Sequence, residues 1–597
     1  MSIKHYFIVV LVLNITLSCK QEIQYRDKPV DFAITSPKQG WTYYDDTKIM
    51  FAINKNTNDI TWSSNISGHL GKGNHFAAYL PEGAHIITAE VKNVKKVSSV
   101  LIFPYALSDR SILINYSPIE IMLKKGKYNS FLYTNEGTIK NFIFGKEITF
   151  PINNNSQSND NITKNVNQLS RCIHLPVPKA YRYTKDVKRQ IMAFDEDNFN
   201  DNDTISETTR SFFVVNTVQQ LGAPHIIDAV LLYQSSNLSI WFPSHCSIES
   251  VIFWSFIRTA ETIILPRLEL LLGKHADIDG DGRIAILFSE TINNENLATG
   301  FFNPVDFFAR NNNALSDMYN PWSNEMDIIY LAVPNDDYAS PFSLQNITAT
   351  LAHELAHACT FTVKTWNHAF NDNANINREE LFLDEGWSHL AENLTGLGIS
   401  GGNIKFLNRF LENTPAYSFC GANIFGQNDS VGMRGAITLF LSWLFWKSGG
   451  ISWNENNPVN LIDLGGIAFL QKMLEIPETG WESIGKAYGQ PVNILFKEML
   501  DEINHHIKTN NVYNYTIDPV TNEAVDFFVN MGKINVPNSN EIITIGLPNT
   551  FAIDTEKSLL SWSCIFFNQF NYESDVLLTL ISGNRNGNIF FSYIHTP

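Results

Sequence analysis

The sequence predicts a multidomain protein in which an all-β N-terminal region and a β-rich C-terminal region flank a central α+β region. Three observations support this fold class. The length of 597 residues implies about three or four domains. Short strand patterns separated by turns occupy residues 28–95 and recur in residues 511–597. Apolar residues at helical spacing dominate the chain after about residue 344.

The N-terminus predicts export. The apolar run Tyr6–Leu13 is too short to span a membrane and is typical of a secretion signal, which we place in residues 1–19. Cys19 resembles a bacterial lipoprotein cysteine, although Thr16 stands where Leu is usual, so simple signal cleavage stays an alternative. We expect a protein that is lipid-anchored at a bacterial cell envelope membrane, or secreted. The net charge of −17 argues against a nucleic-acid partner.

Patterning divides the rest of the chain into five segments. The first resembles a bacterial immunoglobulin-like module, with Trp62 as its expected core aromatic residue. The expected order is an immunoglobulin-like β module (28–95), a small β unit (96–150), an Asn-rich linker (151–170), the α+β region (171–510) and a C-terminal β-rich domain (511–597).

The chemistry concentrates in the pentapeptide His353-Glu354-Leu-Ala-His357. On a helix, residues four apart share a face, so the two imidazoles can hold one zinc ion. Glu354 lies too far round the helix to be a natural third ligand, but it is placed to accept a proton from an activated water. Ser343 is the expected N-cap of this helix, and Leu351 begins an apolar stripe that indicates packing against a core.

Glu385 is the best candidate for a third zinc ligand. It lies in a second predicted helix, residues 378–392, whereas a metzincin site would need Gly and His at the positions of Thr360 and Val363. Two rivals at the start of the same helix, Glu379 and Glu380, are interpreted as solvated charges.

Glu392 lies two turns beyond Glu385 on that helix. It is expected either to orient a ligand histidine through a hydrogen bond or to face solvent.

These motifs resemble the gluzincin group of metallopeptidases and, more narrowly, the hyicolysin family of secreted neutral zinc metallopeptidases. The resemblance covers about residues 171–510 and includes the flanking segments Thr209–Phe212, Asp277–Leu287, Ser323–Tyr330 and Arg434–Leu441. It implies a thermolysin-like α+β catalytic domain that hydrolyses peptide bonds. It also implies that His353, His357 and Glu385 bind zinc and that Glu354 is the catalytic acid/base.

The tetrahedral oxyanion of peptide hydrolysis needs a further donor. His389, Tyr417 and Arg434 are the three candidates for this catalytic role, and the sequence does not choose among them. Residues 327–333 predict a strand just before the zinc helix. In gluzincins an edge strand at this place pairs with an extended peptide substrate, so we expect a protein or peptide partner recognised through its main chain. An ordinary core strand is the alternative.

Asp277, Asp279 and Asp281, followed by Gly282, match the first half of a calcium loop. The twelfth position holds Phe288 in place of the usual Glu, so the motif is incomplete. Structural Ca²⁺ binding is one interpretation. The other is an Asp-Gly turn that enters a strand at residues 284–288.

Two functional classes follow from the sequence. The first is a membrane-anchored zinc endopeptidase, and the alternative is a surface adhesin whose metallopeptidase domain is vestigial. The complete set of His353, Glu354, His357 and Glu385 favours the enzyme. Zinc-dependent hydrolysis of a non-peptide amide is a third reading. Cys359, close to the zinc motif, is interpreted as a packing residue because it points away from His357.

Overall fold

A computed structural model describes most of the chain, with short gaps inside the ranges 32–103, 112–145, 208–367, 378–509 and 515–596. The chain divides into two units, Met1–Phe103 and Pro104–Pro597. The predicted signal with Cys19 and the predicted linker at 151–170 lie outside the described residues, so both stay predictions.

Two β-sheets with one shared apolar core make up the first unit. One sheet has the order β1 (Ile34–Ser36), β3 (Ile49–Ile53), β6 (His75–Ala78), and the other has the order β2 (Thr42–Tyr44), β8 (Val94–Phe103), β7 (Gly83–Val91), β4 (Ile60–Ser64), β5 (Gly68–Lys72). Trp62 is fully buried in this core, as expected, and its Nε1 donates a hydrogen bond to the Gly73 carbonyl at 3.0 Å. Strand β8 ends at Phe103, so the module extends past the predicted boundary at residue 95.

A second β region combines segments that are far apart in the sequence. One of its sheets has the order β10 (Ile119–Leu123), β27 (Val576–Asn586), β12 (Thr138–Gly145), β24 (Lys557–Leu559). The other has the order β23 (Thr550–Phe551), β25 (Ser563–Phe567), β11 (Gly126–Thr134), β28 (Ile589–Thr596), β9 (Ile112–Ile114), with β26 (Phe570–Tyr572) also on β11.

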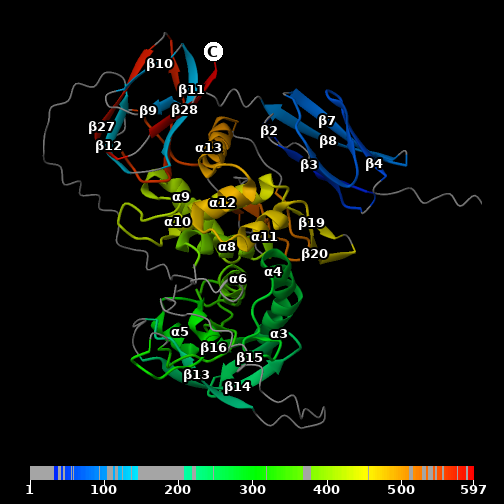
Figure 1. Cartoon of the computed structure of the whole chain (residues 1–597), viewed down its shortest axis with the longest axis vertical. Coiled ribbons are helices and arrows are strands. Elements are labelled where there is room, and N and C mark those ends of the chain that lie inside the picture. The colour runs from blue at the N-terminus through cyan, green and yellow to red at the C-terminus, as the bar shows by residue number, and fades with distance from the viewer. Residues whose placement is uncertain are drawn as a thin grey trace, which may run out of the picture. The chain divides into compact units, whose positions relative to one another are not determined.

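Figure 1 shows this pairing as cyan strands beside red ones. The prediction of two separate units, 96–150 and 511–597, is therefore corrected. Both contribute strands to the same two sheets, whose core includes Tyr128, Leu132 and Phe591. Strand patterns do not reveal such pairing, because partners are chosen by tertiary packing.

The α+β region starts with a six-stranded sheet. Its order is β13 (Thr209–Val214), β14 (His225–Gln234), β15 (Leu238–Pro243), β16 (Ile284–Phe288), β18 (Ile328–Leu331), β17 (Gly300–Phe302). Strands β15, β16 and β18 run parallel, and β17 pairs antiparallel with β18 at one edge of the sheet. The residues of all four strands are buried. The strand predicted after the Asp-Gly turn is β16, within its predicted bounds.

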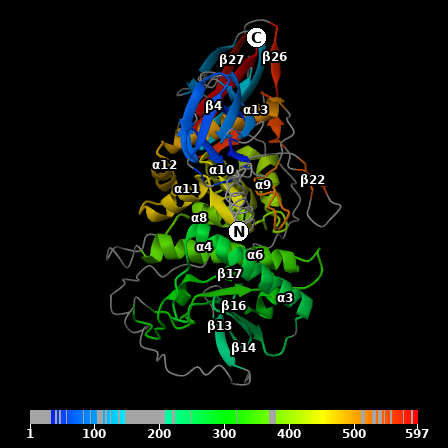
Figure 2. The same cartoon turned by 90° about the vertical axis from the view of Figure 1, so that its right-hand side faces the viewer.

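The helices after residue 344 follow the sheet, as the sequence predicts, but three shorter helices of the described chain lie in sequence between β15 and β17. Helix α6 (Leu344–Thr360) lies between the sheet and the later helices (Figure 2). Ser343 caps it, since its side chain accepts a hydrogen bond from the Asn346 backbone. The other helices are α3 (Ser250–Thr259), α4 (Leu265–Leu272), α5 (Glu290–Glu295), α8 (Leu381–Leu394), α9 (Asn403–Glu412), α10 (Val431–Lys447), α11 (Gly466–Glu475), α12 (Gly480–Tyr488) and α13 (Val492–Thr509), with π-helical turns at Ala260–Ile264 and Phe361–Trp366.

The coarse fold class is confirmed: the chain is multidomain, with a β-rich N-terminal region and a mixed α and β region. Within the described part of the chain, no helix has both the length and the apolar character needed to cross a bilayer.

Candidate metal centre

His353 and His357 lie in the buried C-terminal half of α6, and their Nε2 atoms lie 3.2 Å apart. The Nδ1 atom of each ring is held by a carboxylate. His353 Nδ1 lies 2.7 Å from Glu392 Oε1, and His357 Nδ1 lies 3.0 Å from Asp384 Oδ1. Because both carboxylates come from α8, one helix supplies the ring pair and the next helix orients it.

Glu385 completes the cluster from the centre of α8. Its Oε2 lies 3.4 Å from His353 Nε2, and its Oε1 lies 4.0 Å from His357 Nε2. The side chain is fully buried, and Arg434 of α10 places Nη1 2.8 Å from Oε2. One ligand atom from each of His353, His357 and Glu385 falls within 4.8 Å of the others, so these three residues could hold a metal ion.

The hydrogen bonds indicate which ring nitrogens could face a cation. Each Nδ1 faces a carboxylate acceptor, so the proton of each neutral ring sits on Nδ1 and both Nε2 atoms carry lone pairs. Two lone pairs then converge at 3.2 Å beside the Glu385 carboxylate. The Arg434 guanidinium, 2.8 Å from Glu385 Oε2, also lies against this carboxylate. Nitrogen and carboxylate donors in a buried set of three suit zinc.

Glu354 lies beside this set and faces the edge strand. Its Oε2 accepts a hydrogen bond from the Phe302 backbone amide of β17 at 2.9 Å, while its Oε1 is buried with no hydrogen-bond partner. Burial is the main cause that raises the pKa of Glu354 to about 8, and the nearby Glu385 charge acts in the same direction. A carboxylate with one unpartnered oxygen and a raised pKa is equipped to accept and release a proton.

The close approach of β17 to α6 depends on Gly300. A Cβ atom at this position would lie 2.7 Å from the Tyr330 carbonyl and 2.8 Å from the Thr350 side chain. Absence of a side chain therefore lets the edge strand approach the helix that carries Glu354.

The three candidates for the oxyanion donor fall in different places. Arg434 contacts Glu385, and its Nε and Nη2 atoms bond to Asp429 at 2.7 and 2.6 Å. The Tyr417 ring packs against Gly432, and its hydroxyl forms a hydrogen bond with Arg409. Unlike Arg434, Tyr417 forms no hydrogen bond or ion pair with Glu385 among the described residues.

His389 lies against His353, with ring centroids 4.5 Å apart. Its Nδ1 faces two acceptors, Asn403 Oδ1 at 3.0 Å and Glu392 Oε1 at 3.3 Å, so the proton of the neutral ring sits on Nδ1. Nε2 is buried with no hydrogen-bond partner. Burial lowers the pKa of His389 to about 4, so the ring stays neutral and Nε2 is an acceptor rather than a donor.

The structure changes the interpretation of three acidic residues just before α8 and within it. Asp384 was not identified, although it directly precedes Glu385 and is therefore near it on the helix. Glu379 is not a solvated charge: it is buried, lies 3.7 Å from Lys364 Nζ and accepts a hydrogen bond from the Gly480 backbone amide at 2.6 Å. Glu392 is fully buried and bonded to His353, so the solvent-facing alternative is wrong.

The strand predicted at residues 327–333 is β18, which lies between β16 and β17 and is fully buried. It is a core strand, as the alternative interpretation had it, and not the edge. The edge is β17, which is too short for an alternating pattern to reveal.

Asp277, Asp279 and Asp281 meet in the turn that enters β16, and their carboxylates fall within 4.8 Å of one another. Asp279 Oδ1 is buried with no hydrogen-bond partner. Burial, with the charges of Asp327 and Asp281, raises the pKa of Asp279 to about 7. The cluster is compatible with Ca²⁺, which stays a prediction.

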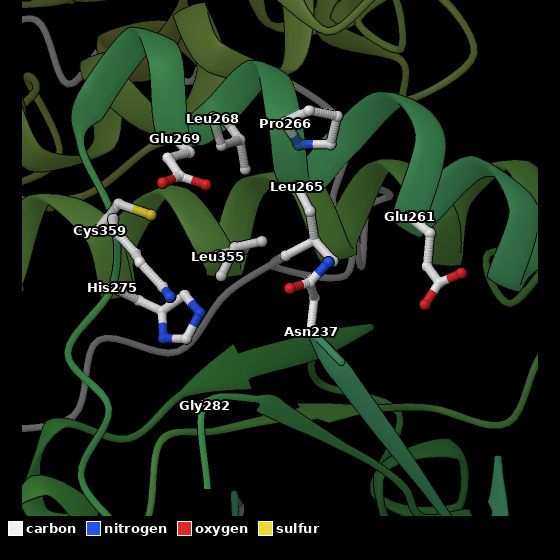
Figure 3. Close-up of a pocket in the computed structure, with 11 residues that line it drawn as sticks. Asn237, Glu261, Leu265, Pro266, Leu268, Glu269, His275, Gly282, Leu355 and Cys359 are labelled. Atoms are coloured by element: carbon white, nitrogen blue, oxygen red, sulfur yellow. The ribbon is translucent and has the colours of Figure 1, made fainter. Parts of the chain in front are cut away.

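The opposite side of α6 borders a cavity of about 130 Å³. Figure 3 shows Leu355 and Cys359 of α6 lining it together with Glu269 and His275. Cys359 is 2% exposed and is not among the side chains that form the histidine and glutamate cluster. Its position agrees with the packing role expected from its direction on the helix.

Comparison with models of known protein families and with curated proteins gives no match. The hyicolysin resemblance therefore rests on the motifs themselves, and the function is argued from the geometry of the site.

Proposed function

We propose that the protein is a zinc-dependent endopeptidase of the gluzincin type, related to the hyicolysins. The observation that carries the proposal is the buried convergence of His353 Nε2, His357 Nε2 and Glu385 beside an unpartnered oxygen of Glu354. Export through the signal at residues 1–19, with an anchor at Cys19, would place this activity at the cell envelope. The N-terminal sandwich, proposed to be immunoglobulin-like, would then act as a spacer or binding unit.

His353, His357 and Glu385 would hold the zinc ion, with Glu392 and Asp384 fixing the two rings through their Nδ1 atoms. A zinc ion bound there would supply Lewis acidity and would lower the pKa of a water to roughly 7. Arg434 contacts Glu385 Oε2, the same oxygen that lies 3.4 Å from His353 Nε2, and Asp429 holds Arg434 in turn. The centre is thus supported from α6, α8 and α10.

Glu354 is the general base and acid of the proposed reaction. Its Oε1 accepts the proton of the attacking water, and the same carboxyl group then delivers that proton to the leaving amine. The Phe302 amide keeps Oε2 occupied and leaves the other oxygen without a hydrogen-bond partner. One carboxylate oxygen is thus fixed by a hydrogen bond, and the other is available for proton transfer.

The substrate would add to β17 as an extended strand. This strand is the edge of the sheet, and its Phe302 amide already reaches the catalytic carboxylate. Main-chain pairing gives affinity with little sequence preference, which fits an endopeptidase acting on unfolded protein. Of the oxyanion candidates we favour Arg434, because it is cationic and touches the ligand set, whereas His389 Nε2 is an acceptor.

Hydrolysis of unfolded casein by the chain lacking residues 1–19 tests the proposal, with Glu354→Gln as the matched variant. We expect Glu354→Gln to keep its zinc and to lose activity by several orders of magnitude, because the variant cannot accept a proton. Equal cleavage by both proteins would contradict the proposal. Zinc content without cleavage in the wild type would instead indicate a narrower substrate or a non-peptide amide.

A further inference from the structure

Outside the proposed catalytic centre, another group of side chains that can bind a metal lies beyond the carboxyl ends of two inner strands of the six-stranded sheet. His245, Cys246 and Glu290 place an imidazole nitrogen, a thiol sulfur and a carboxylate oxygen within 4.8 Å of one another. We propose that these three residues form a second metal site, which takes zinc or another thiophilic divalent cation and stabilises the fold. This inference does not depend on the proposed peptidase activity.

The topology explains why these residues meet. His245 and Cys246 follow the end of β15, and Glu290 follows the end of β16. The two strands are parallel neighbours, with Trp241 opposite Leu287, so their carboxyl ends lie at the same edge of the sheet (Figure 1). The Cys246 amide bonds to the Pro243 carbonyl at 3.0 Å, and this tight turn brings the thiol back toward β16.

The geometry suits a small soft cation. His245 Nε2 lies 3.3 Å from Glu290 Oε2, close to the separation expected for two ligands about 2.1 Å from one zinc ion. The His245 side chain is 68% exposed and that of Glu290 is 46% exposed, so both can adjust and solvent can supply a fourth ligand. A thiolate in the set favours zinc or cadmium over calcium or magnesium.

Among the described residues, Cys246 forms no disulfide. Cys246 is a free cysteine, and burial together with the adjacent Glu290 carboxylate raises its pKa to about 12. The thiol is therefore protonated when no cation is bound. Binding would form a sulfur–metal bond and release the thiol proton to solvent.

Such a site would join two neighbouring loops. The turn after β15 leads into α3, and Glu290 starts α5. A metal bound there would fasten both loops to the same edge of the sheet and stabilise the folded chain by mass action. Because none of the three ligands comes from α6 or α8, we assign the ion a structural role.

Cadmium titration of the reduced, metal-stripped full chain tests this site, because a cadmium–thiolate bond has its own ultraviolet charge-transfer absorption. The proposed catalytic centre has no thiol ligand, so the signal separates the two sites. We expect one equivalent of Cd²⁺ to produce the band in Glu385→Ala and at most two equivalents to produce it in the wild type, where the proposed catalytic centre can also take the cation. The band should be lost in Cys246→Ser and kept in Cys359→Ser.

Two further variants test the other ligands. His245→Ala and Glu290→Gln should each weaken cadmium binding at least tenfold. The proposal is overturned if the wild type gives no band, if Cys246→Ser keeps it, or if both ligand variants bind with wild-type affinity. Thermal unfolding without metal should be the same in Cys246→Ser and wild type, which shows that the variant folds.

Discussion

Glu392 offers the most informative perturbation of the proposed zinc centre. It accepts from His353 Nδ1 at 2.7 Å, and both side chains are fully buried. A buried, charge-assisted hydrogen bond of this kind contributes about 1.5–3 kcal/mol. Loss of a carboxylate that orients a ligand histidine typically costs about 10–100-fold in metal affinity, or about 1.4–2.7 kcal/mol.

We therefore expect Glu392→Ala to bind zinc about 10–100-fold more weakly than the wild type. Glu392→Gln should lose less, because the amide oxygen can still accept from His353. Competition of the metal-stripped protein with a chromophoric chelator measures both affinities. Asp501→Asn is the matched control, since Asp501 is an equally buried carboxylate that bonds to Ser592 and Lys497 instead.

Wild-type zinc affinity in Glu392→Ala would refute the reasoning, as would an equal loss in Asp501→Asn. The first result would mean that His353 does not need Glu392 to present Nε2. The second would mean that zinc affinity follows general stability rather than the orientation of the ring.

Three further predictions concern stability. Burial raises the pKa of Glu379 to about 7 from an ordinary value of 4.5, so the folded chain binds more protons than the unfolded chain between these values. The free energy of unfolding should therefore fall by up to about 3 kcal/mol as pH rises through this window. Urea titrations at several pH values should show a smaller fall in Glu379→Gln. An equal dependence of the unfolding free energy on pH in both proteins would contradict the burial argument. Gly300→Ala should destabilise the α+β region by about 1–3 kcal/mol, because its Cβ would lie 2.7 Å from a carbonyl of β18. An unaltered urea midpoint would show that the strand can shift freely. Trp62→Ala should cost the N-terminal unit about 3–5 kcal/mol without changing casein cleavage, and reduced cleavage would show that this unit takes part in activity.

The local parts of the site were predictable from the sequence. The spacing of His353 and His357 places both rings on one helix face, and the structure brings Glu385 to them as expected. Ser343 caps the helix as its position predicts. These features depend on helical geometry within one or two segments, which residue spacing determines.

The remaining parts depend on contacts between segments distant in the sequence. Asp384 was missed because a second acidic residue beside Glu385 gives no sign of which histidine it meets. Glu379 was expected in solvent, but packing against Lys364 and Gly480 buries it. The edge strand β17 has only three residues, and its place is set by β18.

The measurement that tests the zinc-peptidase proposal most directly is a zinc titration of metal-stripped protein, with casein cleavage followed at each step. The Cys246→Ser background removes the thiol of the second proposed site. We predict that activity rises in proportion to added zinc and saturates at about one equivalent per chain, and that His357→Ala neither saturates nor cleaves. Cleavage that is independent of zinc, or that persists in His357→Ala, would contradict the assignment of the buried cluster as a catalytic zinc centre.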